Sequence, residues 1–180
     1  SIANSGEGVH ISTNSADAKF GNVTISGVNF VNSNADTGLF VSIQNYGNMS
    51  LTGVTAERNG ATGIMLDNQN SGAANAGTIT LNKVNVNYNK SDGLGVDASG
   101  SVTLNTVYAL NNGATGVSMG QSSDFGPEIF TIVNCVIHGN TGNGINVNLF
   151  GGSGSTVVIT NTSYFGNDVD GSGQLDVYLH

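Results

Sequence analysis

Residues 102–117 read VTLNTVYALNNGATGV, and this stretch decides the fold. Two pairs of alternating apolar residues are followed by an asparagine and then a glycine: Val102, Leu104, Val107, Ala109, Asn112 and Gly116. Alternation with a period of two is typical of a β-strand with one buried face. The extra residue between the two pairs predicts a bend that keeps the same side of the chain inward.

The asparagine and the glycine four residues after it recur seven times, at intervals of 23 to 30 residues: Asn4/Gly8, Asn34/Gly38, Asn59/Gly63, Asn89/Gly93, Asn112/Gly116, Asn140/Gly144 and Asn167/Gly171. A period of this length predicts supersecondary units that stack in one dimension. The segments that join the units differ in length, as insertions at a surface do.

Each of the first six glycines begins a third short segment in which apolar residues alternate again. The outward positions of this segment form one column: His10, Phe40, Met65, Gly95, Ser118 and Asn146. Three strands close one turn of a solenoid. The chain has 27 glycines and one proline, so no amphipathic helix is predicted. We therefore expect an all-β parallel solenoid of about six to seven coils, each with three short strands, in a single domain over residues 1–180.

Two columns of equivalent residues should run along this solenoid. Val54, Val84, Val107 and Cys135 share an inward template position and are expected to stack in the core. Asparagine tolerates a left-handed backbone, and its amide can bond the equivalent amide one coil away. We therefore expect the repeated asparagines to form a ladder at a bend. The following glycines would allow a positive φ or a close approach of the backbone.

Residues 102–117 resemble the repeat of the right-handed parallel β-helix superfamily. This superfamily includes pectate-lyase-like enzymes, phage tailspikes, and bacterial surface proteins such as polymorphic outer-membrane proteins and adhesins. The chain resembles the surface-protein repeats most. The resemblance covers nearly the whole chain and implies a right-handed β-helix, but its motif specifies coils and no activity.

Charge and composition restrict the partners. The net charge is −8, with twelve acidic and four basic residues, which argues against nucleic acid and anionic membranes as partners. No stretch approaches the roughly 20 apolar residues of a membrane span. A polar surface rich in Asn, Ser, Thr and Gly is common in exported bacterial repeat proteins, which favours an extracellular or cell-surface location. The chain starts at Ser1, and we interpret it as a mature or excised segment.

Asp67 and Asp97 are the candidate catalytic residues. Each directly follows the third strand of its repeat, in consecutive coils. Equivalent positions in adjacent coils lie about 4.8 Å apart, a spacing that suits a shared cation or the carboxylate pair of a retaining glycosidase. The alternative is two solvated loop carboxylates. The resemblance implies that an enzyme of this superfamily would carry several carboxylates, often with Arg or Lys, near this strand, and the outward column contains none.

The segment from Asp168 to Asp176 is a candidate calcium loop. Oxygen ligands stand at loop positions 1, 3, 5 and 9: Asp168, Asp170, Ser172 and Asp176. This spacing resembles the first nine residues of an EF-hand or dockerin loop. The bidentate glutamate of position 12 is replaced by Leu179. The alternative is an ordinary polar turn in the last coil.

These observations favour a non-catalytic extracellular structural or adhesive domain of a surface protein or filament. The first alternative is a carbohydrate-active β-helix enzyme or its remnant. The second is a glycan-binding or ice-binding module, because outward hydroxyl-bearing residues form a regular column: Thr24, Ser50, Thr80, Thr103 and Thr131. A solenoid also exposes apolar residues and strand edges at its ends, so we expect a homo-oligomer, end-to-end assembly, or flanking domains of a parent protein.

Overall fold

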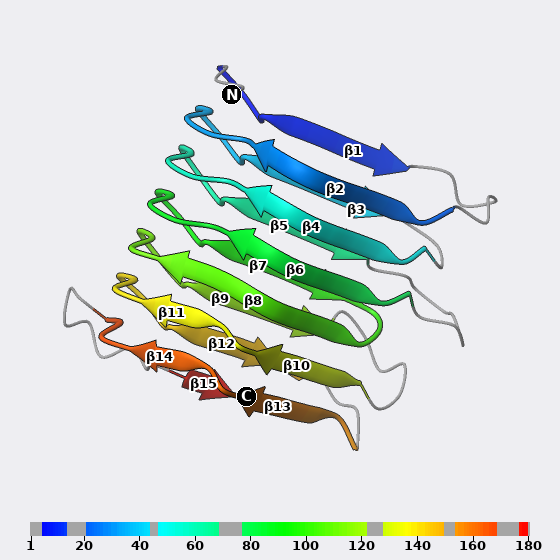
Figure 1. Ribbon diagram of the computed structural model, residues 1–180, viewed down its shortest axis with the longest axis vertical. Helices are drawn as coiled ribbons and strands as arrows, with labels where there is room; N and C mark the ends of the chain where they lie inside the picture. Colours follow the sequence, from blue (N-terminus) through cyan, green and yellow to red (C-terminus); the bar gives the residue numbers. More distant parts are fainter. Residues whose placement is uncertain are drawn as a thin grey trace.

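The computed structural model describes residues 5–13, 21–43, 47–68, 77–121, 128–149, 154–168 and 177–179. Within these ranges the chain forms fifteen β-strands. The same ranges contain no helix that is long and apolar enough to cross a membrane. Figure 1 shows the strands stacked in two layers, and every strand pair is parallel.

Each layer is one sheet. The first has the strand order β1 (Val9–Thr13), β3 (Leu39–Ile43), β5 (Ile64–Asn68), β7 (Leu94–Ala98), β9 (Val117–Gln121), β12 (Ile145–Asn148) and β15 (Val177–Leu179). The second has the order β2 (Val23–Phe30), β4 (Met49–Thr55), β6 (Ile79–Asn85), β8 (Val102–Leu110), β10 (Ile129–Val133) and β13 (Thr156–Thr160), with β11 (Val136–His138) and β14 (Ser163–Phe165) beside it. Neighbouring strands come from consecutive repeats, which confirms the predicted β-solenoid.

The two strands expected upstream of each asparagine are joined in most repeats into one longer strand. β8 runs through both apolar pairs, whereas β10 and β11, like β13 and β14, are separate. The bend between the pairs is made by one residue with a positive φ: Gly27 (100°), Gly53 (71°), Lys83 (55°), Thr106 (57°), Asn134 (56°) and Asn161 (49°). Such a residue bends the backbone without changing which side faces inward.

The predicted inward column is confirmed. Val54, Val84 and Val107 are fully buried, and Cys135 is 1% exposed. The backbone N–H of Val107 donates to Cys135 Sγ over 3.3 Å. Burial raises the pKa of the Cys135 thiol, which therefore behaves as a small apolar core residue.

The predicted asparagine ladder is also confirmed. The backbone N–H and the Nδ2 of each asparagine donate to Oδ1 of the next, at 2.8–3.2 Å, through Asn34, Asn59, Asn89, Asn112, Asn140 and Asn167. From Asn59 onward, each Nδ2 also donates to a backbone carbonyl of the preceding coil, as Asn89 does to Ala56 O at 3.0 Å. These bonds satisfy amides that the core would otherwise leave unpaired.

The ladder differs from the prediction in the backbone of its members. The left-handed residue is the one before each asparagine: Ser33 (60°), Arg58 (56°), Tyr88 (58°), Asn111 (54°), Gly139 (69°) and Gly166 (61°). The ladder asparagines are thus selected for their amide and not for their tolerance of positive φ. The following glycines serve close approach, because a Cβ on Gly63 would lie 2.5 Å from Asn89 Nδ2.

Candidate functional site

The outward face of the first sheet carries the candidate catalytic pair. The parallel register aligns the predicted outward column His10, Phe40, Met65, Gly95, Ser118 and Asn146 across β1, β3, β5, β7, β9 and β12. Two residues further along these strands lies a second outward column: Ser12, Ser42, Asp67, Asp97, Gly120 and Asn148. The parallel register therefore fixes the positions of these outward side chains, and the unequal loops between the strands do not disturb it.

Asp67 and Asp97 are direct register partners on β5 and β7, as the repeat predicted. Ser42 Oγ donates to Asp67 Oδ2 over 3.1 Å from the strand on the other side. Both aspartates belong to strands and not to solvated loops. The pair is therefore held by the sheet itself.

The two carboxylates differ in their electrostatics. Burial raises the pKa of Asp97, and the neighbouring charge of Asp67 raises it further. Glycine follows Asp97 in the column, and a Cβ on Gly120 would lie 3.0 Å from Asp97 Oδ1. The raised pKa favours the protonated form of Asp97 more than in an ordinary aspartate. In the described part of the chain, no group of three or more His, Cys, Asp or Glu side chains could hold a metal ion.

The candidate calcium loop lies mostly outside the described residues. Of its four predicted ligands only Asp168 is described; Asp170, Ser172 and Asp176 are not. Asp168 has a φ of 58°, and its backbone N–H donates to Gly142 O over 3.0 Å. This bond continues the stacking of the turns after the ladder. The calcium site stays a prediction.

A family model described as "Right handed beta helix region" matches residues 1–171. The chain belongs to the right-handed β-helix family. Comparisons with curated proteins and with solved structures gave no match. The family assignment agrees with the coils, the ladder and the parallel sheets described above, and it names no reaction.

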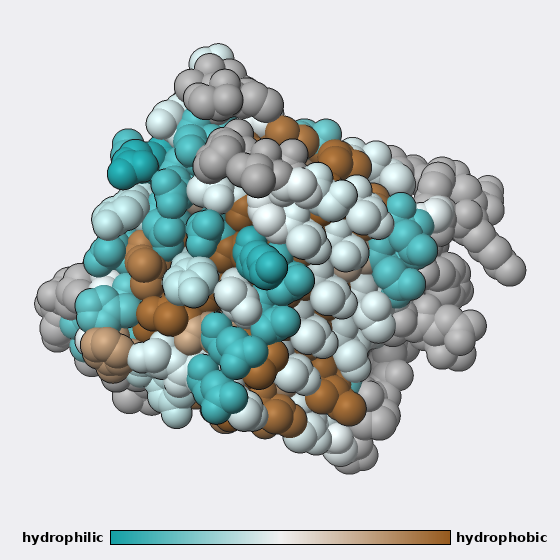
Figure 2. Space-filling model, viewed as in Figure 1, coloured by the Kyte–Doolittle hydropathy of each residue, from teal (hydrophilic) through white to brown (hydrophobic). Residues whose placement is uncertain are grey.

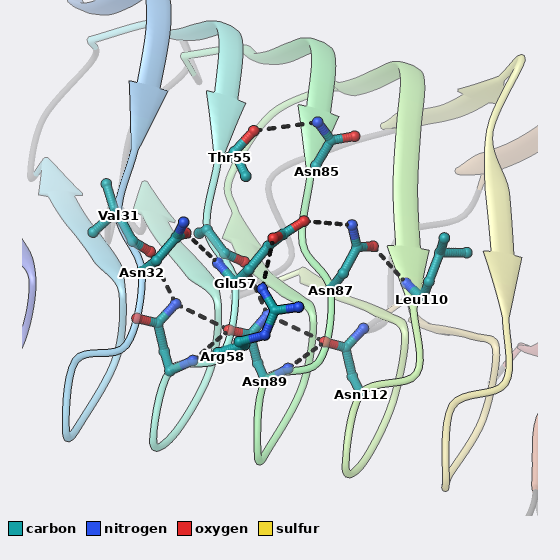
Figure 3. A network of polar contacts seen from close by, with 12 residues as sticks. Val31, Asn32, Thr55, Glu57, Arg58, Asn85, Asn87, Asn89, Leu110 and Asn112 are labelled. Carbon is teal, nitrogen blue, oxygen red and sulfur yellow. Dashed lines mark hydrogen bonds and ion pairs between the residues drawn. The ribbon is translucent and has the colours of Figure 1, made fainter. Parts of the chain in front are cut away.

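A polar network on the flank of this β-helix was not predicted. Figure 3 shows Glu57 at its centre: its backbone N–H donates to Asn32 Oδ1 over 2.9 Å, and its Oε1 accepts from Asn87 Nδ2 over 2.9 Å. Asn87 Oδ1 in turn accepts from Leu110 N over 3.0 Å. These residues stand two positions before successive ladder asparagines, a regularity that could have revealed the network in the sequence.

Beyond this network the same flank becomes aromatic and apolar. The register aligns Tyr108 with Val136, and Leu110 with His138 and Phe165. Phe165 is 56% exposed and lies against the His138 ring at a centroid distance of 4.6 Å. Figure 2 shows hydrophobic side chains on this flank, at the left over β8, β11 and β14. We call these residues the aromatic flank: Tyr108, Leu110, Val136, His138 and Phe165.

The hydroxyl-bearing column of the second sheet is in register as predicted. Thr24, Ser50, Thr80 and Thr103 are successive partners, and Thr131 follows Thr103. The column ends at Val158, which pairs with Thr131. The register agrees with the geometry assumed for an ice-binding face, but ice binding itself stays a prediction.

Proposed function

We propose that this β-helix is a non-catalytic extracellular structural and adhesive domain of a surface protein or filament. The observation that carries the proposal is the uninterrupted ladder from Asn34 to Asn167. Each ladder step adds two hydrogen bonds parallel to the stacking axis, beside the bonds of the two sheets. A rod held by bonds along its own axis resists bending and stretching, which is what a spacer or a filament requires.

The aromatic flank supports the adhesive part of the proposal. Exposed apolar groups that gather on one face mark binding surfaces more often than scattered ones do. Tyr108 is 38% exposed and Phe165 56%, and aromatic rings beside amide side chains offer both stacking and hydrogen bonding. The proposed partner is another surface component, with a glycan as the principal alternative to a protein.

The C-terminal coil supports assembly through the end of the rod. Leu179 is the register partner of Val147, and Tyr164 is the partner of Ile137. Val147 and Ile137 are fully buried, but Leu179 is 51% exposed, because no further described strand covers it. We propose that this end is covered by another copy, by flanking domains of a parent protein, or by a strand of another chain.

Light scattering at rising protein concentration tests assembly. The proposal expects a mass above 18.2 kDa that grows with concentration and returns to the monomer in Leu179→Asp. Phe165→Ser, on the outer surface of the same coil, is the matched control and should still assemble. A wild-type protein that stays monomeric at the highest concentration contradicts assembly of copies.

Adhesion is tested separately, by binding of the protein to immobilised neutral and acidic polysaccharides and to cell surfaces. Tyr108→Ala with Phe165→Ala should abolish binding. Thr80→Ala, on the outer face of the same sheet but on the other side of the bend, should leave it unchanged. Equal binding by the double variant and the wild type contradicts a role for the aromatic flank.

A carbohydrate-active enzyme remains the second candidate, because Asp67 and Asp97 lie side by side and the pKa of Asp97 is raised. The test is the release of new sugar ends from acidic and neutral polysaccharides. Our proposal expects no release by the wild type. Cleavage by the wild type that disappears in Asp97→Asn, and persists in Asp36→Asn, would establish the enzyme instead.

A further inference from the structure

Glu128 is the one charged residue that is buried among the described parts of the chain. It directly precedes β10 and is 4% exposed. Both backbone groups of Glu128 bond to the next coil. The N–H donates to Ser155 Oγ over 3.2 Å, and the C=O accepts from Thr156 N over 2.8 Å. The position of this carboxyl is therefore set by β13 as well as by β10.

The Glu128 side chain points toward the core. It lies two and four residues before Phe130 and Ile132, which are fully buried, so the strand alternation turns all three to the same side. The corresponding residue in the four earlier coils of this sheet is a glycine: Gly21, Gly47, Gly77 and Gly100. A Cβ on Gly77 would lie 2.1 Å from Gly47 O, and a Cβ on Gly47 would lie 2.9 Å from Gly21 O, so these two positions leave no room for a side chain at this corner. Glu128 places a carboxyl where the repeat otherwise has none.

Neither carboxylate oxygen of Glu128 has a hydrogen-bond partner, and each exposes less than 1 Å². An ionised carboxylate in such a position loses its hydration without compensation, whereas the neutral acid loses much less. Burial alone raises the pKa of Glu128 to about 7. Among the described residues, including those of β8 and β13 on either side of β10, no charged side chain contributes to this pKa shift.

We propose that Glu128 is a proton-dependent switch for the packing of the last two coils: its neutral form allows β10 to lie against β13, and its ionised form loosens this contact. The direction of the pH dependence follows from the difference in proton binding between the folded and the unfolded chain. The folded chain keeps this proton up to a higher pH than the unfolded chain, whose glutamate ionises near 4.5. The stabilisation is therefore complete at acidic pH and decreases as the pH rises between 4.5 and about 7. Acidic surroundings would stiffen this end of the rod.

Thermal unfolding from pH about 5 to pH about 8 tests the switch. The wild-type Tm should fall as the pH rises, and Glu128→Gln, which imitates the neutral acid, should show a clearly smaller fall. Asp36→Asn is the control, because Asp36 is an exposed carboxylate far from the last two coils. It should keep the wild-type slope. Parallel curves for the wild type and Glu128→Gln overturn the proposal, as does a slope that vanishes in Asp36→Asn.

Two measurements on the wild type keep the proposal testable should Glu128→Gln fail to fold. The carboxyl carbon of Glu128, followed by NMR, should titrate with a midpoint near 7. A midpoint below 5 overturns the switch. Hydrogen exchange of the Thr156 amide, corrected for intrinsic rates, should accelerate at the higher pH relative to the Asn89 amide in the middle of the ladder. Equal acceleration at both amides overturns it as well.

Discussion

Asn89 Nδ2 donates to Asn112 Oδ1 over 3.1 Å, although 23 residues separate the two in sequence. The same nitrogen donates to Ala56 O over 3.0 Å, in the coil on the other side. One amide therefore joins three successive coils. Because the group is buried, each of these bonds lies where water cannot replace it.

Replacing Asn89 with leucine should lower the free energy of unfolding by about 1–3 kcal/mol. The change leaves the Asn59 N–H and Nδ2 without their acceptor and removes the Nδ2 donor of Asn112 Oδ1, which keeps only the backbone N–H of residue 89. Urea unfolding measures the loss. Asn82→Leu, on the outer face of β6, is the control and should change stability little; an equal loss in both variants contradicts a special role for the ladder.

Val84→Asp should unfold or aggregate the protein, because it buries a charge without a partner in the middle of the core. Circular dichroism and the soluble fraction after expression measure the outcome. Thr80→Asp places the same carboxylate on the exposed side of the same strand and should remain folded. A folded Val84→Asp protein with wild-type stability would show that the inward column is wrongly assigned.

Millimolar calcium should raise the Tm if the loop from Asp168 to Asp176 binds this ion, since a ligand of the folded state stabilises by mass action. Asp170→Ala should remove the response. Asp36→Ala, in a turn at the other end of the ladder, should retain it. A wild-type Tm that does not respond to calcium returns the segment to an ordinary turn.

Asp97→Asn should stabilise the protein relative to the wild type as the pH rises above 3.8, the ordinary value for an aspartate. The pKa of folded Asp97 is raised, so the wild type loses stability as the pH rises through that window, and the amide has no proton to lose. Melting curves at pH about 3 to about 7 measure the difference. Asp36→Asn is the control. A constant Tm difference between Asp97→Asn and wild type across the range contradicts the raised pKa of Asp97.

Much of the fold could be predicted because its signals are local and repeated. Alternation at Val102, Leu104, Val107 and Ala109 marks the buried face of one coil, and the same pattern in other repeats places their side chains in the same columns. The pairing of Asp67 with Asp97 followed from the same reasoning, because both stand at one template position. The exception is the left-handed position before each ladder asparagine. Residues as different as Ser33 and Tyr88 occupy it, so no residue type marks it in the sequence.

By itself the sequence determined the coils, the inward columns and the members of the ladder, since a parallel stack repeats one local pattern at one spacing. Only the tertiary structure decided how deeply each polar group is buried and which neighbours it meets. Asn87 reaches Glu57 across 30 residues, and Glu128 is enclosed by strands from other coils. The loss of hydration of a buried group depends on all the atoms that surround it, and most of those atoms belong to residues far away in the chain. The local sequence around Glu128 or Asn87 therefore could not predict how deeply these side chains are buried.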